Sequence, residues 1–161
     1  QDASGRKVTV AILDFTASAM VKRDQYAALA DGIPLVLGTE LVSHPAIELV
    51  ERQARRGCAT RTAPIYRLFA LPESTPPKPG LLRIGDGGST IELELWEMPL
   101  SQYGSFVACI PAPLGIGTLE LEDGSSVQGF LCEAAATEGA EDITQYGGWR
   151  AYCAAVRIWT P

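Results

Sequence analysis

The stretch that decides the fold is CIPAPLGIGTLELEDGSSVQGFLCE, residues 109–133, because its second half has the pattern of a β-hairpin. Apolar and acidic residues alternate over 119–122, as they do in a strand with one buried and one solvated face. Asp123–Gly124 is a preferred dipeptide for a tight turn between antiparallel strands, and a second apolar run follows at 126–133. These residues therefore predict an antiparallel pair of strands.

The first half of this stretch is a nearly uncharged segment, Pro111–Gly117, with two prolines and two glycines. A phosphate-binding loop of the Walker type would need a Lys and a Ser or Thr, and it would lead into a helix. Here the glycines lead into a strand instead. We therefore expect Pro111–Gly117 to be a rigid corner that sets the entry into the hairpin.

Elements on both sides of the hairpin have mixed periodicities, which predict an α+β fold built around a mixed β-sheet. Strand patterns occur at 8–15, 46–52, 65–71 and 89–98, and helical patterns at 24–41, after Pro99 and at 143–156. Pro34 interrupts the first helical pattern, and the proline-rich residues 72–80 predict a loop. The order strand, helix, strand over 8–52 predicts a βαβ unit with parallel strands.

Composition and charge exclude several classes of protein. The chain has 161 residues, 47% of them hydrophobic and 20% charged, and it contains no apolar run long enough to span a bilayer. The net charge is −6, and the excess of acidic residues is located in the part of the chain after residue 63. This distribution disfavours nucleic-acid binding. The first seven residues are polar, so we expect a flexible tail at 1–7 and no signal peptide.

The cysteines and the single histidine do not have the spacing of a metal site, and we expect neither metal nor cofactor. The four cysteines are 21 or more residues apart, and His44 has no Cys or second His beside it. Buried thiols are the favoured interpretation, and two disulfides are the alternative if the protein is exported.

A small anionic substrate is suggested by basic and aromatic residues around the proline-rich loop, Arg61, Tyr66, Arg67 and Lys78. Arginine holds a carboxylate with two hydrogen bonds, although residues that solvate the flanks of a strand have the same pattern. Glu133 follows three apolar residues at the hairpin's end, where apolar neighbours could raise its pKa into the range of an acid/base catalyst. Exposure at a strand end is the alternative.

Four long motifs together resemble the C-terminal domain of allophanate hydrolase, an enzyme of urea degradation. They are ATRTAPIYRLFAL, PPKPGLLRI, the segment from IELELWEMPL through GFLCE, and EDITQYGGWRAY, and they span about residues 56–154. The resemblance implies a fold of the γ-glutamyl cyclotransferase type, a small mixed barrel with flanking helices. It also implies that the domain assists decarboxylation of N-carboxycarbamate, the product of an amidase partner domain, in the cytoplasm.

The same resemblance suggests which residues form the site. Arg61 and Tyr66 would hold the carboxylate, and Glu133 would be the catalytic acid/base group. The wall would be shaped by the segment Pro113, Leu114, Gly115 and Gly117, with Lys78 nearby. The family's Gly-Ala-His loop is absent before Arg61, and Gln128 stands where relatives often have Lys, so an inactive scaffold or assembly module is the alternative.

Residues 8–52 resemble something else, the βαβ start of envelope proteins of the TolB and CsgG type. Together the two resemblances predict a composite chain, with 8–52 completing the sheet of the domain at 53–161. Loss of the family's usual first strand predicts a homodimer. An exported envelope component is the third interpretation.

Overall fold

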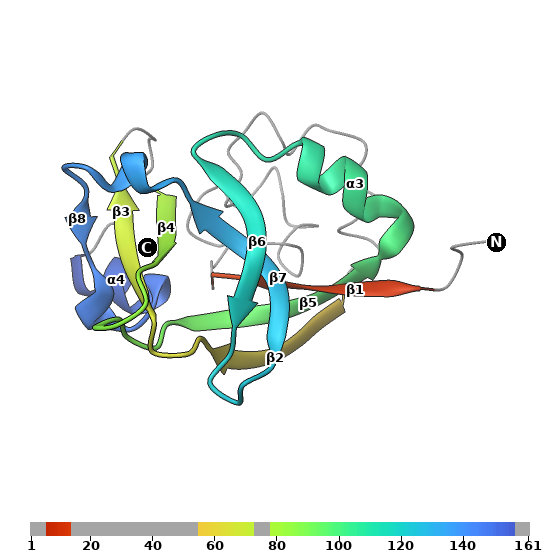
Figure 1. The fold of residues 1–161 in the computed structure, drawn as a ribbon, viewed down its shortest axis with the longest axis horizontal. Coiled ribbons are helices and arrows are strands. Elements are labelled where there is room, and N and C mark those ends of the chain that lie inside the picture. The colour runs from red at the N-terminus through yellow and green to blue at the C-terminus, as the bar shows by residue number, and fades with distance from the viewer. Residues whose placement is uncertain (1–5, 14–54, 73–77, 157–161) are drawn as a thin grey trace, which may run out of the picture.

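The computed structural model describes residues 6–13, 55–72 and 78–156, and it arranges their strands in two sheets (Figure 1). The strands are β1 (Lys7–Ile12), β2 (Arg55–Arg61), β3 (Tyr66–Leu71), β4 (Lys78–Arg83), β5 (Glu92–Pro99), β6 (Leu114–Glu120), β7 (Ser126–Cys132) and β8 (Glu141–Asp142). The helices are α3 (Leu100–Ala108) and α4 (Trp149–Val156), with short 3₁₀ turns η3 (Ala134–Thr137) and η4 (Thr144–Tyr146).

The larger sheet has five strands in the order β2-β5-β1-β7-β6 and is mixed, because β1 and β7 are parallel and the other pairs antiparallel. The smaller sheet has the order β4-β3-β8. The predicted α+β class with a mixed sheet is thus confirmed. Within the described residues the sheet does not close into a barrel: its edge strands β2 and β6 meet only at one corner, where Thr62 bridges Leu121.

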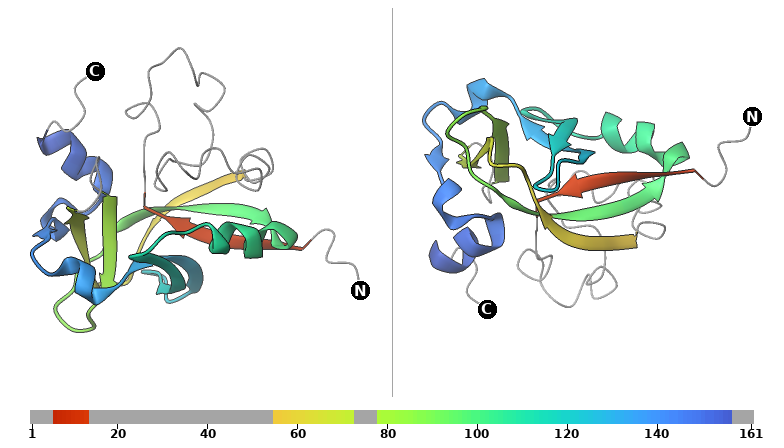
Figure 2. Two further views of the ribbon diagram at one scale, coloured as in Figure 1. Left: turned by 90° about the horizontal axis from the view of Figure 1, so that it is seen from above. Right: turned by 60° about the horizontal axis from the view of Figure 1, so that its bottom comes forward.

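The first strand lies inside the larger sheet, between β5 and β7 (Figure 2). Its residues Val10, Ala11 and Ile12 are almost completely buried, as expected for a continuous apolar strand with a neighbour on each side. Gly129 on β7 allows the two strands to pack closely, because a Cβ there would lie 2.9 Å from the carbonyl oxygen of Ala11. The expected helix at 24–41 and strand at 46–52 lie outside the described residues.

The hairpin forms as predicted, with β6 and β7 paired from Leu114 opposite Cys132 to Glu120 opposite Ser126. The expected corner is shorter than predicted. Strand β6 begins at Leu114, so most of Pro111–Gly117 is strand, and only Pro111–Pro113 turns the chain. The two glycines adopt extended backbone in the strand, a conformation open to any residue.

Both faces of β5 are covered at its centre. Charged and apolar residues alternate along this strand, a pattern typical of one solvated face, but Glu94 is 4% exposed and Trp96 3%. Arg150 of α4 reaches over this face, 3.8 Å from the Glu94 carboxylate, and the Trp96 indole N–H donates to the same side chain at 3.3 Å. The alternating glutamates of β5 therefore do not indicate which of its residues are buried.

The helices also differ from their predicted patterns. In α3 the fully buried side chain is Phe106, which packs edge-to-face on Phe130 of β7, whereas Leu100 at the start of the helix is exposed. The expected helix at 143–156 is divided at Gly147, which has a φ of 69° that favours glycine.

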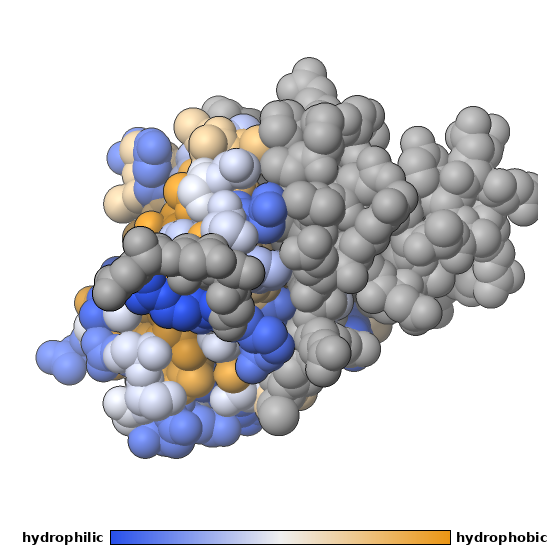
Figure 3. Space-filling view, turned by 90° about the vertical axis from the view of Figure 1, so that its right-hand side faces the viewer, coloured by the Kyte–Doolittle hydropathy of each residue, from blue (hydrophilic) through white to orange (hydrophobic). Residues whose placement is uncertain are grey.

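The end of the molecule where β1 begins and β5 ends shows small hydrophobic patches interspersed with hydrophilic ones (Figure 3). Among the described residues, no helix combines the length and apolarity needed to cross a membrane. The predicted homodimer is not tested by these observations and stays a prediction.

Candidate functional site

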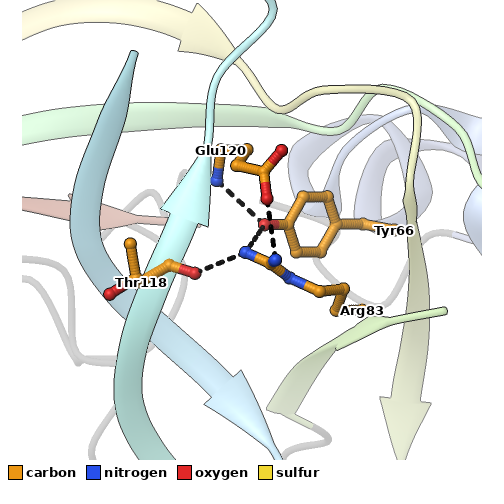
Figure 4. Close-up of polar contacts among 4 residues, drawn as sticks. All are labelled: Tyr66, Arg83, Thr118 and Glu120. Carbon is orange, nitrogen blue, oxygen red and sulfur yellow. Dashed lines mark hydrogen bonds and ion pairs between the residues drawn. The ribbon is translucent and has the colours of Figure 1, made fainter. Parts of the chain in front are cut away.

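The two sheets meet around the side chain of Tyr66, at the start of β3 (Figure 4). The residue is fully buried, and its hydroxyl oxygen accepts a hydrogen bond from the backbone N–H of Glu120 at 2.9 Å. The ring of Tyr66 is buried among apolar side chains, which suits an aromatic residue at this position. Its buried hydroxyl needs a hydrogen-bond partner, which it finds on β6. Tyr66 therefore ties the smaller sheet to the edge of the larger one.

Arg83, at the end of β4, completes this cluster. Tyr66 and Arg83 are paired residues of the β3–β4 hairpin, which places their side chains on one face. The Arg83 Nη2 donates to the Tyr66 hydroxyl at 3.0 Å and to the Thr118 carbonyl oxygen at 2.8 Å, and Nη1 donates to the Glu120 carboxylate at 2.7 Å. The guanidinium carbon also lies 5.5 Å from the centre of the Tyr66 ring, within the range of a cation–π contact.

Tyr66 and Arg83 together satisfy the free edge of β6. In an antiparallel strand the N–H and C=O of one residue point to the same side, and those of Glu120 point away from β7. The N–H of Glu120 donates to the Tyr66 hydroxyl, and its C=O accepts from the N–H of Ala63 at 2.8 Å. The carbonyl of Thr118 accepts from the Arg83 guanidinium. Side chains thus replace a missing neighbouring strand.

The cluster of Tyr66, Arg83, Thr118 and Glu120 has the chemistry of a carboxylate-binding site. Its cation is held in place by three acceptors, yet the Arg83 and Glu120 side chains are 40% and 46% exposed. An exposed ion pair of this kind contributes little to stability, so an incoming carboxylate could replace Glu120 at low cost. Among the described residues, the buried Tyr66 hydroxyl accepts hydrogen bonds from Arg83 and from the backbone N–H of Glu120, so it positions the guanidinium against the edge of β6.

Arg61, the first predicted carboxylate ligand, lies elsewhere. Its Nη2 is 3.0 Å from the Glu92 carboxylate, across the β2–β5 pair, in an exposed ion pair. The contact points toward the turn at Gly147, since a Cβ there would lie 3.8 Å from the Arg61 Nη2. The structure therefore does not bring the side chains of Arg61 and Tyr66 together, although both residues were expected in one site.

Lys78 is also distant from Tyr66. It begins β4 and pairs with Leu71, whereas Arg83 ends the same strand opposite Tyr66. Five residues of extended chain correspond to about 17 Å. The cation that the structure places beside Tyr66 is thus Arg83 and not Lys78.

The other predicted residues gather at the far end of the hairpin. Leu114 is buried opposite Cys132, and the Pro113 carbonyl accepts from the backbone N–H of Glu133 at 2.9 Å. The Glu133 residue is exposed and begins the turn η3, in agreement with the alternative of a solvated strand end. Six residues separate this end of the hairpin from Glu120, about 20 Å of strand, so Glu133 and Tyr66 do not form one site.

Gly115 and Gly117 lie between these two ends. Gly115 is exposed with open space around it, while a Cβ on Gly117 would lie 2.6 Å from the Leu131 side chain. Gly117 thus lies directly before Thr118 of the cluster, and Gly115 lies further toward the corner. Of the wall residues that the resemblance suggested, only Gly117 is next to the cluster in sequence.

Sequence reasoning missed Arg83 and Glu120. Arg83 follows two leucines in a motif that was noted only for its resemblance, and Glu120 was taken as one of several solvated carboxylates. The pairing register of β3 and β4 would have found Arg83, because a hairpin closed by the loop at 72–80 places it opposite Tyr66. No pattern within the sequence indicates that β6 passes beside them.

Two of the described cysteines, Cys109 and Cys132, are not in a disulfide, which disagrees with the alternative of two disulfides. Burial raises the pKa of the Cys132 thiol to about 11, so it is protonated at neutral pH. The described part of the chain also contains no group of three or more His, Cys, Asp or Glu side chains that could hold a metal ion.

Comparison with known proteins agrees with the motif resemblance. The family model of the allophanate hydrolase C-terminal domain matches residues 34–154. Urea amidolyase of Saccharomyces cerevisiae is 41% identical over 143 residues, which cover 86% of this chain and 7% of that protein. The family match begins inside the segment 8–52 that the sequence alone assigned to an envelope-protein pattern.

Solved structures give the same result. Kluyveromyces lactis allophanate hydrolase aligns with a TM-score of 0.70 and 34% identity, over 94% of this chain and 22% of that chain. A uropathogenic E. coli-specific protein aligns with a TM-score of 0.66 and 26% identity, over 92% of this chain and 97% of that chain. A gamma-glutamyl cyclotransferase is also among the structural neighbours, at a TM-score of 0.42 and 10% identity, too low to carry any argument about the site.

The chain thus spans a small fraction of the amidolyase and of the yeast allophanate hydrolase, and nearly the whole length of the bacterial protein. The family match covers about three quarters of the chain, and its ordered motifs coincide with β3 to α4. This chain belongs to the allophanate hydrolase C-terminal domain family.

Proposed function

We propose that the chain assists the decarboxylation of N-carboxycarbamate in urea degradation, acting on the product of an allophanate-cleaving amidase domain. Membership of the family and the urea amidolyase relative support the pathway. The observation that carries the proposal is the Arg83 guanidinium, which is oriented by Tyr66 and Thr118 and faces solvent only in part.

The reaction needs a site that holds one carboxylate while the other leaves. N-carboxycarbamate is a dianion in which one nitrogen joins two carboxylates. The bond between this nitrogen and one carboxylate carbon breaks, CO2 leaves, the electron pair stays on nitrogen, and nitrogen takes a proton from solvent to give carbamate. A fixed cation beside the retained carboxylate stabilises the negative charge that develops on the nitrogen.

Arg83 and Tyr66 take defined roles in this scheme. The Arg83 guanidinium exchanges the Glu120 carboxylate for the retained carboxylate of the substrate, and the buried Tyr66 hydroxyl positions the guanidinium by accepting one of its N–H groups. Glu120, once displaced, turns to solvent, because 46% of its side chain is already exposed. No metal or organic cofactor takes part in these steps.

The experiment uses the full chain added to an amidase domain that is cleaving allophanate, with CO2 release followed against a sample without the chain. We expect faster release with the wild type. Arg83→Gln should reduce the acceleration about tenfold or more, because it removes charge-assisted hydrogen bonds to the substrate.

The matched control is Arg67→Gln. Arg67 lies on the outer face of β3 and forms an exposed ion pair with Asp142 at 3.7 Å, with 47% of its side chain exposed, similar to Arg83. This control should leave the acceleration unchanged. Equal loss in both variants, or no acceleration by a folded wild type, would contradict the proposal, and a folded assembly module would then be the better account.

We also propose a cytoplasmic location, in accordance with the family resemblance. The thiols of Cys109 and Cys132 support it, because oxidising compartments favour disulfides and these two cysteines form none.

A further inference from the structure

A second group of polar side chains adjoins the cluster on the same hairpin. The hydroxyl of Tyr103 on α3 donates to Oε1 of Gln128 on β7 at 3.3 Å, and Nε2 of Gln128 donates to Oγ1 of Thr118 on β6 at 3.3 Å. These two contacts orient the Gln128 amide weakly, with its N–H group toward Thr118. Burial raises the pKa of Tyr103, so the hydroxyl remains a donor at neutral pH.

The register places Gln128 on the same face of the hairpin as the carboxylate cluster. Thr118 and Gln128 are directly paired, so their side chains share one face, and Glu120 lies on that face two residues further along. Helix α3 lies on one side of the hairpin and β4 on the other (Figure 1). Tyr103 of α3 contacts Gln128, and Arg83 of β4 contacts Thr118.

Thr118 connects the two groups directly. Its carbonyl oxygen accepts from Arg83 at 2.8 Å, and its hydroxyl accepts from the Gln128 amide at 3.3 Å. Both donors are thus in contact with one residue, Gln128 is half-buried, and Thr118 is exposed. At 3.3 Å both contacts of the Gln128 amide are longer than usual hydrogen bonds, so they are weak and readily exchanged for a ligand.

We propose that Gln128 is a specificity-determining residue, whose amide receives the second carboxylate of a small dicarboxylate held at its first carboxylate by Arg83. This inference rests on the proposed function and deepens it, because it predicts preference for two acidic groups separated by one atom over a single carboxylate. The amide N–H is a neutral donor. It can hold the second carboxylate by a hydrogen bond alone, without neutralising its charge.

The test measures binding with two probes that do not react, malonate and acetate, by isothermal titration calorimetry with the full chain. Malonate has a methylene group where the substrate has its N–H. We expect the wild type to bind malonate at least about tenfold more tightly than acetate. Gln128→Leu should reduce this ratio about tenfold with acetate binding unchanged, and Gln128→Lys should raise it about tenfold, since an ammonium group donates a charge-assisted hydrogen bond.

Gln145→Leu is the matched control, because Gln145 is exposed in η4, away from the hairpin. Thermal unfolding of each variant shows that it is folded. An unchanged malonate-to-acetate ratio in both Gln128 variants would overturn the inference.

The same titrations separate this inference from the proposed function. If acetate binds and Arg83→Gln abolishes that binding while the Gln128 variants have no effect on the ratio, only the role of Gln128 is wrong. If neither probe binds the folded wild type, the carboxylate site itself is wrong, and the role of Gln128 is overturned with it.

Discussion

Replacement of the buried hydroxyl in Tyr66→Phe is expected to destabilise the protein by about 2 kcal/mol. The side chain is fully buried, and its oxygen accepts the backbone N–H of Glu120 and one N–H of Arg83. Arg83 can turn to water because it is 40% exposed, whereas the N–H of Glu120 loses its partner at the junction of the two sheets. A buried donor without a partner costs about 1–3 kcal/mol.

The free energy of unfolding is measured by urea denaturation, and a parallel thermal scan should show a melting temperature lower by about 4–8 °C. Tyr103→Phe is the control, because that hydroxyl is only half-buried and makes one hydrogen bond, of 3.3 Å. It should cost less than about 1 kcal/mol. The reasoning is refuted if Tyr66→Phe is as stable as the wild type, or if the two variants lose stability equally.

Three further predictions concern other parts of the fold. Gly104→Ala should stabilise the protein by about 1 kcal/mol, because alanine favours the helix α3 and its methyl group would have nothing within 4 Å. Gly88→Ala should destabilise the protein by about 1–3 kcal/mol, because its Cβ would lie 2.4 Å from backbone atoms. Urea denaturation compares the free energy of unfolding of both variants with that of the wild type. Burial raises the pKa of Tyr152 to about 12 from 10.0, so the free energy of unfolding should fall as the pH rises from 10 to 12. Tyr152→Phe should remove this part of the dependence on pH, and a variant with the same dependence as the wild type would contradict the assignment. In native protein at pH 8, iodoacetamide should modify Cys109, which is partly exposed, before buried Cys132, whose pKa is about 11; peptide mass spectrometry gives the order, and faster labelling of Cys132 would oppose it.

The fold could be predicted from the sequence where one local signal dominates. The Asp123–Gly124 turn between two alternating runs gave the hairpin, and the strand at 65–71 was found within one residue. The corner before the hairpin was predicted too long, because prolines and glycines were read as turn residues. The glycines are needed in part for packing, since Leu131 fills the space beside Gly117.

The site was predictable only in part, because it is assembled from segments distant in the sequence. Tyr66 was named for its position near a basic segment, but its cation comes from the strand that pairs with β3, and its second partner comes from the edge of β6. Arg61 precedes Tyr66 by five residues, and proximity in the chain suggested a shared site. The turn between β2 and β3 separates them, so Arg61 pairs with Glu92 instead.

The lifetime of N-carboxycarbamate is the measurement that tests the central claim most directly. Allophanate labelled with ¹³C is cleaved by an amidase domain in the NMR tube, and the decay of the labelled intermediate is followed at increasing concentrations of this chain. Our account predicts that the lifetime shortens in proportion to the wild-type concentration and stays near its uncatalysed value with Arg83→Gln. A lifetime that does not change with the concentration of folded wild type would contradict a role for this chain in decarboxylation.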